Sequence, residues 1–116
     1  MDAVTAAADA IGDRWTLLIL RDVIVHDRRH FRALLLGSAE GIATNILTDR
    51  LVKLVDAGIL ARGTAPRGQR ARYSLTEAGL QTAPVILALA EWGREWRDGE
   101  VPVIDLDELR ARHTES

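Results

Sequence analysis

Cysteine is absent from the 116 residues of this chain. Its absence excludes disulfides, thiolate metal ligands and thiol-based redox sensing within the sequence. No apolar run approaches the roughly 18 residues that a membrane-spanning helix needs. Because the first residues, MDAVTAAADAIGD, contain no basic segment, we also expect no signal peptide.

Aromatic residues make up only 4% of the chain, but apolar residues make up 47% and charged residues 28%. This balance is typical of a globular protein, and the length suits one domain with one core. We expect that domain to cover residues 1–100, followed by an acidic C-terminal tail over 101–116.

The chain has little net charge, since 15 basic residues against 17 acidic ones leave a formal net charge of −2. It is unevenly distributed, however. Residues 28–72 contain nine basic and three acidic residues, a net charge of +6, which leaves −8 on the rest of the chain. A basic middle between acidic ends can attract a polyanion despite a negative total, although solvated faces also carry charge.

Apolar residues at helical spacing predict helices over 2–11, 13–25, 31–36 and about 43–57. A further helix should begin after Thr76, break at Pro84 and end near Gly99. Asp105 is a candidate cap for a short helix over 106–112. Between these helices, residues 59–62 and 70–75 read as two short strands joined by a turn that contains Pro66 and Gly68.

A short helix, a glycine-bearing turn and a longer amphipathic helix are typical of a helix-turn-helix. The basic hairpin that follows over about 62–72 resembles a wing. On the helix over about 43–57, Ile46, Leu47, Leu51, Leu54 and Val55 form an apolar face opposite a polar one. The helix alone suits core packing as well as DNA reading, and the hairpin arginines favour DNA.

Five segments, in order, resemble the HxlR-type winged-helix regulators: GDRWTLLILRDV, HFRALL, EGIATNILTDRLVKLVDAGIL, RYSLTEAG and PVILALAEWG. The resemblance covers about residues 4–97. It implies a mainly α fold with a small β-hairpin, a winged helix-turn-helix with N- and C-terminal dimerisation helices. It also implies a cytoplasmic, dimeric transcription factor without enzymatic activity.

Carried over residue by residue, the resemblance implies DNA contacts from the recognition helix at Thr44, Asn45, Thr48, Asp49 and Arg50, and from the wing at Arg67, Arg70 and Arg72. Lys53 joins them by its place on the polar face. Asp49 could accept a hydrogen bond from cytosine, but an ion pair with Arg50 or Lys53 is favoured for it. Arg50 could contact phosphate or brace the helix.

Many family members carry a cysteine just before the first helix, where this chain has Asp2. This departure removes the thiol switch of some relatives. If the protein senses a signal, it does so without a thiol.

A late helix carries a stripe of large apolar residues, including two of the three tryptophans. Core packing would explain the stripe, but in so short a chain it favours a partner surface. We expect a homodimer interface formed by Val4, Ala8, Val85, Leu89, Trp92 and Trp96, whereas Trp15 should belong to the core. Such a dimer would bind a palindromic double-stranded operator.

Other classes of function are less well supported. The chain lacks the GxSxG, GxxxxGK[ST], GxGxxG and HExxH motifs, so we expect no enzyme and no cofactor. His26 and His30 lie on a connection, and we expect no metal site there. A winged helix that binds a protein partner or a small molecule remains the alternative. An effector pocket at the dimer interface could be lined by Trp15 and Trp92.

Overall fold

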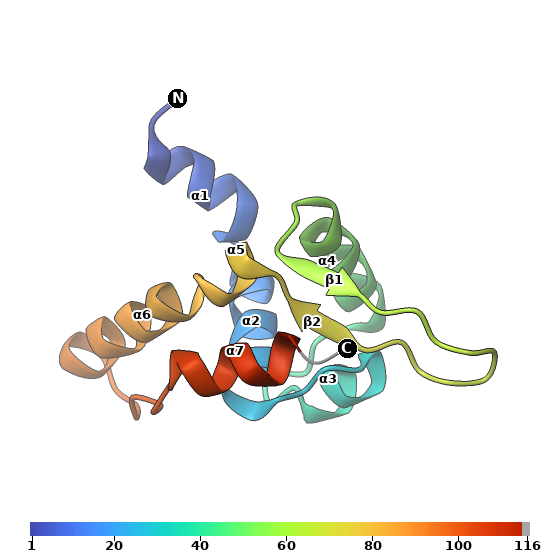
Figure 1. Cartoon of the computed structure of the whole chain (residues 1–116). Coiled ribbons are helices and arrows are strands. Elements are labelled where there is room, and N and C mark those ends of the chain that lie inside the picture. Colours follow the sequence, from blue (N-terminus) through green and yellow to red (C-terminus); the bar gives the residue numbers. More distant parts are fainter. Residues whose placement is uncertain (115–116) are drawn as a thin grey trace.

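The computed structural model describes residues 1–114 as seven helices and one two-stranded antiparallel hairpin (Figure 1). In chain order the elements are α1 (Ala3–Ile11), α2 (Arg14–His26), α3 (Phe31–Gly37), α4 (Thr44–Asp56), β1 (Leu60–Arg62), β2 (Tyr73–Leu75), α5 (Glu77–Leu80), α6 (Ala83–Trp96) and α7 (Leu106–Thr114). This order confirms the predicted winged helix-turn-helix. None of the helices described is long and apolar enough to cross a membrane.

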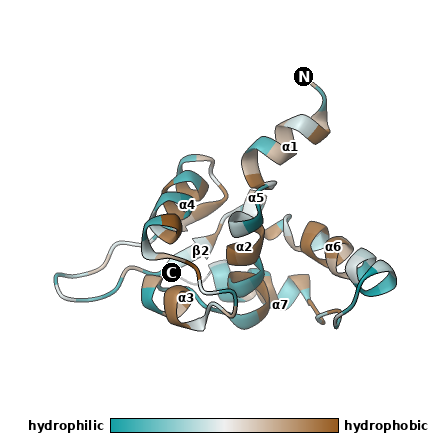
Figure 2. Ribbon diagram, turned by 180° about the vertical axis from the view of Figure 1, so that it is seen from behind, coloured by the Kyte–Doolittle hydropathy of each residue, from teal (hydrophilic) through white to brown (hydrophobic). Residues whose placement is uncertain are grey.

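The core surrounds α2, on which Leu20 and Val23 are fully buried. α3, α4 and α6 all contact this helix. Figure 2 shows apolar residues along α2 and α6, whereas the loop of the hairpin is mostly hydrophilic. The core therefore holds the two helices of the helix-turn-helix against one central helix and leaves the hairpin loop outside.

The predicted helix boundaries are largely confirmed. The side chain of Asp2 accepts a hydrogen bond from Thr5 N at 2.9 Å and caps α1. The predicted break falls between α5 and α6, and Pro84 lies in the first turn of α6, where its missing N–H costs no helical bond. The predicted end of α6 near Gly99 was three residues too late, because Arg97 leaves the helical conformation with φ −134° and ψ −98°.

The first helix stands apart from the rest of the fold. No residue of α1 is buried, and only its last residue, Ile11, packs against the core. In Figure 1 α1 extends away from the body of the domain. An apolar, Ala-rich helix in this position lacks a partner within the described chain.

The last helix completes the core. The sequence predicts an acidic tail over 101–116 with a short helix over 106–112, and α7 contacts β2 and α5 and buries Leu109 fully. The expected cap is present, since Asp105 accepts from Glu108 N at 3.1 Å. Glu115 and Ser116 lie outside the described residues.

His113 on α7 is only 6% exposed, and its Nδ1 accepts a hydrogen bond from Leu75 N at 2.8 Å. Burial, together with the positive charge of Arg29, lowers the pKa of His113 from 6.5 to about 4. Between these two pH values, His113 is protonated in the unfolded chain but stays neutral in the folded protein. Stability is therefore lost as the pH falls from about 6.5 toward 4.

Between pH 7 and pH 5 we expect His113 to cost the fold about 2 kcal/mol of unfolding free energy. Urea denaturation at the two pH values measures the change. The variant His113→Gln retains a hydrogen-bond acceptor but cannot be protonated, so its loss should be smaller. His26→Gln, at an exposed position, should behave like the wild type. Equal losses in all three proteins would contradict the assignment.

Candidate nucleic-acid interface

The turn between α3 and α4 is held by its own side chains. Ser38 Oγ accepts from Ile42 N at 3.0 Å, and Gly41 takes a φ of +73°, which favours glycine. Ile42 is 7% exposed and anchors the turn in the core. The angle at which α4 leaves α3 is therefore set by packing.

A second contact fixes the turn to α2. Both guanidinium Nη atoms of Arg21 bind the carboxylate of Glu40, at 2.9 and 2.8 Å. This bidentate pair lowers the pKa of Glu40 to about 2. Arg21 also donates a hydrogen bond to Asp22 at 2.9 Å, and Asp22 forms an ion pair with Arg28 at 3.3 Å. A chain of four charges thus connects the centre of α2 to the residues just before α4.

The outer face of α4 has the composition predicted from the sequence. Leu47, Leu51 and Leu54 are buried, and the opposite face exposes Thr44, Asn45, Thr48, Asp49 and Lys53. The N-cap residue Ala43 has no side-chain acceptor for the first-turn N–H groups. Short polar side chains at this end of the helix suit close approach to a duplex.

Charges on the second turn of α4 neutralise one another. Asp49 lies 2.8 Å from Arg50 and 3.2 Å from Lys53, and hydrogen bonds first from Lys53 and then from Arg50 lower its pKa. Arg50 also binds Asp13, the N-cap of α2, at 3.2 Å. The ion pair expected of Asp49 is confirmed, and Arg50 braces α4 against α2. Contact of either with DNA stays a prediction.

The hairpin projects beyond the domain (Figure 1). Its strands pair over only three residues, with Arg62 opposite Tyr73, and are shorter than predicted. Tyr73 and Leu75 are buried and anchor the hairpin in the core. At the tip, Gln69 N donates to Pro66 O at 3.0 Å and Gly68 has a φ of +85°. Arg67 is thereby placed at the outermost turn.

Arg29 belongs to the structure rather than to the interface. It is 2% exposed, and its guanidinium donates to Tyr73 O at 2.9 Å, to Ser74 Oγ at 2.7 Å and to Arg112 O at 2.9 Å. Tyr73 N in turn donates to Arg29 O at 2.7 Å. One basic residue counted in the positive middle of the chain thus holds the base of the hairpin.

Within the basic segment, the unpaired positive charge is concentrated on the hairpin and at the start of α3. Among residues 1–114, five exposed arginines of the basic segment form no ion pair: Arg32, Arg62, Arg67, Arg70 and Arg72. All lie on the hairpin or at the start of α3. The predicted wing residues are thus brought together, whereas Arg50 and Lys53 are paired on α4.

Arg32 and Arg62 were not singled out from the sequence. With Arg70 they line a cavity of about 470 Å³ between α3 and the hairpin, together with the rings of Phe31 and Tyr73. Their only signal in the sequence was membership of the basic segment. Unpaired guanidinium groups in such a hollow suit phosphate oxygens.

Metal ligation finds no support in the described part of the chain. No group of three or more His, Cys, Asp or Glu side chains there could hold an ion. His30 instead places Nδ1 3.1 Å from Ala71 O, at the base of the hairpin.

The sequence is similar to a known family and to known transcriptional regulators. A family model described as HxlR-like helix-turn-helix matches residues 10–101. An uncharacterized HTH-type transcriptional regulator of Synechocystis is 34% identical over 93 residues, which are 79% of this chain and 67% of that protein. One of Mycobacterium tuberculosis is 36% identical over 96 residues, 82% of this chain and 59% of that protein. The chain thus spans about three fifths of the length of the mycobacterial relative.

Solved structures are similar as well. The structure of PA1607 has a TM-score of 0.74 and 30% identity, and covers 88% of this chain and 79% of its own. The redox regulator HypR in its reduced form has a TM-score of 0.73 and 28% identity, and covers 84% of this chain and 95% of its own.

Proposed function

The chain belongs to the HxlR-like helix-turn-helix family of DNA-binding transcriptional regulators, which are not enzymes, and we propose that it reads a specific duplex sequence as a homodimer in the cytoplasm. The N-terminal half of α4 enters the major groove, and the hairpin contacts the phosphate backbone or the minor groove. The observation that carries this proposal is the set of five exposed, unpaired arginines on the hairpin and at the start of α3, together with the exposed polar face of α4.

The charge pattern separates this proposal from a protein-binding winged helix. A helix that docks into a protein groove presents apolar anchors, whereas the outer face of α4 exposes Thr, Asn, Asp and Lys side chains and one apolar residue, Val52. Val52 suits the methyl group of thymine. DNA is therefore the better fit to this surface.

Asn45 is the side chain on α4 best suited to base recognition, since an amide pairs with adenine through two hydrogen bonds. We expect Asn45→Ala to change the preferred base at one operator position by tenfold or more, with little change in the salt dependence of binding. Fluorescence anisotropy with duplexes altered at single positions measures both quantities.

Asp56→Ala, at the exposed C-terminal end of α4, is the matched control and should keep the wild-type base profile. An unchanged profile in Asn45→Ala would remove Asn45 from base readout. If the wild-type protein shows no salt-sensitive binding to the DNA flanking its own gene, the proposed function itself fails.

Dimerisation is proposed through the apolar faces of α1 and α6. Val4 is 79% exposed, and Leu89, Trp92 and Trp96 are between 48% and 64% exposed. Val85 and Ala8 are exposed beside them. Apolar area of this kind on two projecting helices is a feature of subunit interfaces. A two-fold dimer would present its recognition helices about 34 Å apart, one turn of DNA.

Replacing both exposed tryptophans, Trp92→Ser with Trp96→Ser, should raise the dimer dissociation constant by about a thousandfold, because interface tryptophans commonly contribute 2 kcal/mol or more each. Sedimentation velocity measures the change. Val103→Ser removes an apolar side chain that is 98% exposed and lies outside α1 and α6, and it should leave the dimer intact. A wild-type protein that is monomeric at micromolar concentration would contradict the dimer.

Regulation by a small molecule is also proposed for this chain. The similar structure HypR is described as a redox regulator, but the present chain has no cysteine. We therefore do not extend thiol chemistry to it. A bound effector that shifts the spacing of the two recognition helices would serve the same purpose.

A further inference from the structure

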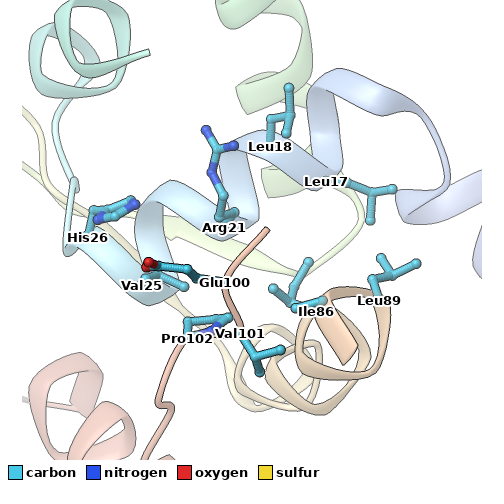
Figure 3. A pocket seen from close by; sticks show the side chains of 11 residues that line it. Leu17, Leu18, Arg21, Val25, His26, Ile86, Leu89, Glu100, Val101 and Pro102 are labelled. Carbon is cyan, nitrogen blue, oxygen red and sulfur yellow. The ribbon is translucent and has the colours of Figure 1, made fainter. Parts of the chain in front are cut away.

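A pocket of about 580 Å³ opens between α2, α6 and the segment that follows α6 (Figure 3). Most of its lining is aliphatic: Leu17, Leu18, Val25, Ile86, Leu89 and Val101. This volume is in the range of sites that take small organic ligands. The tryptophans expected to line an effector pocket, Trp15 and Trp92, are not among its lining residues.

The charged residues of the pocket differ in what they offer a ligand. Arg21 contributes only its stem, because its guanidinium is bound to Glu40 and Asp22. Figure 3 shows that guanidinium pointing away from Ile86 and Val101. Glu100 lines the pocket and has no hydrogen bond or ion pair within residues 1–114. The lining therefore offers a ligand one unpaired carboxylate, together with the imidazole of His26.

We propose that this pocket binds an apolar small molecule that carries one cationic group, with the cation at Glu100 and the apolar part against Leu17, Leu18 and Ile86. An unpaired carboxylate beside an aliphatic wall favours an amine over a neutral or anionic molecule of the same shape. The single complementary charge decides the ligand class.

A ligand in this pocket would contact Arg21, which connects the pocket to the DNA-binding elements. The stem of Arg21 lines the pocket, and its guanidinium holds Glu40, four residues before the start of α4. A ligand that displaces this stem shifts the turn before the recognition helix. This consequence rests on the proposed function, whereas binding in the pocket does not.

The test uses three probes that share one apolar body: phenylbutylamine, phenylbutanol and phenylbutyrate. Amide NMR spectra of the whole chain, without DNA, report binding through shifts at Leu17, Ala90 and Val101. We expect the amine to bind at about 1 mM or below, as suits so few atoms, and at least fivefold more tightly than the other two.

Two variants assign the site. Ala90→Leu fills the pocket and should abolish binding of the amine, while Glu100→Gln should abolish the preference for the amine over the alcohol. Glu95→Gln, on an exposed position of α6 outside the pocket lining, should retain that preference. Thermal unfolding checks that each variant is folded.

Equal binding of the three probes, or binding unaffected by Ala90→Leu, would overturn the proposal. So would the absence of shifts at the lining residues in the dimer, which would mean that a second copy fills the pocket. Where the wild-type protein binds DNA, the amine should change that affinity at least threefold, and Glu40→Gln should remove the effect. Failure of DNA binding leaves the NMR result standing, so the two proposals fail separately.

Discussion

Replacing Arg67, Arg70 and Arg72 together with alanine should weaken DNA binding about a hundredfold at roughly 0.15 M salt and lower the slope of log affinity against log salt by about 3. Each side chain is exposed and unpaired on the hairpin. Each phosphate contact adds about 0.9 to that slope through released counterions. The loss should be nearly the same for all sequences, because phosphates carry no base information.

Anisotropy titrations at several salt concentrations measure affinity and slope together. Arg94→Ala removes an exposed positive charge from α6 and should leave the slope unchanged. A triple variant with the wild-type slope would show that the hairpin does not touch the backbone. The domain would then have to bind through α4 alone.

Gly79→Ala should lower the unfolding free energy by about 3 kcal/mol, the upper end of what overpacking costs. Gly79 is buried in α5, and a Cβ at this position would lie 2.2 Å from the carbonyl oxygen of Ile59. That oxygen is backbone and cannot turn aside. Thr76 also holds α5 against the residues before β1, since its hydroxyl donates to Gly58 O at 2.5 Å and accepts from Gly79 N at 3.1 Å.

Gly93 gives the matched control. It lies inside α6, and a Cβ there would meet nothing within 4 Å. Gly93→Ala should therefore raise stability by up to about 1 kcal/mol through helix propensity. Urea unfolding compares the two variants. Similar small changes in both would mean that α5 does not pack closely on Ile59.

Local pattern predicted the elements that carry the function. The spacing of Leu47, Leu51 and Leu54 predicted which face of α4 is buried, and therefore which side chains face outward. The cap at Asp105 followed from residue type alone. The ion pair of Asp49 was also expected, because its cationic partners lie one and four residues away on the same helix.

Contacts between distant parts of the chain could not be predicted in this way. Arg29 is separated by 44 residues from Tyr73 and by 83 from Arg112, to which it donates. Nothing near it in sequence distinguishes it from Arg28, which is partly exposed and forms an ion pair with the buried Asp22. The packing of α7 through Leu109 and the pocket between α2 and α6 depend on long-range packing in the same way.

Selection of bound duplexes from a random DNA pool tests the central claim most directly. We predict enrichment of a palindrome whose half-sites are centred about ten base pairs apart, which would report sequence recognition and two-fold symmetry together. Asn45→Ala should change a base in each half-site, and the triple arginine variant should select the same sequence more weakly. A pool without any enriched sequence, under conditions where the protein is folded, would contradict specific DNA recognition.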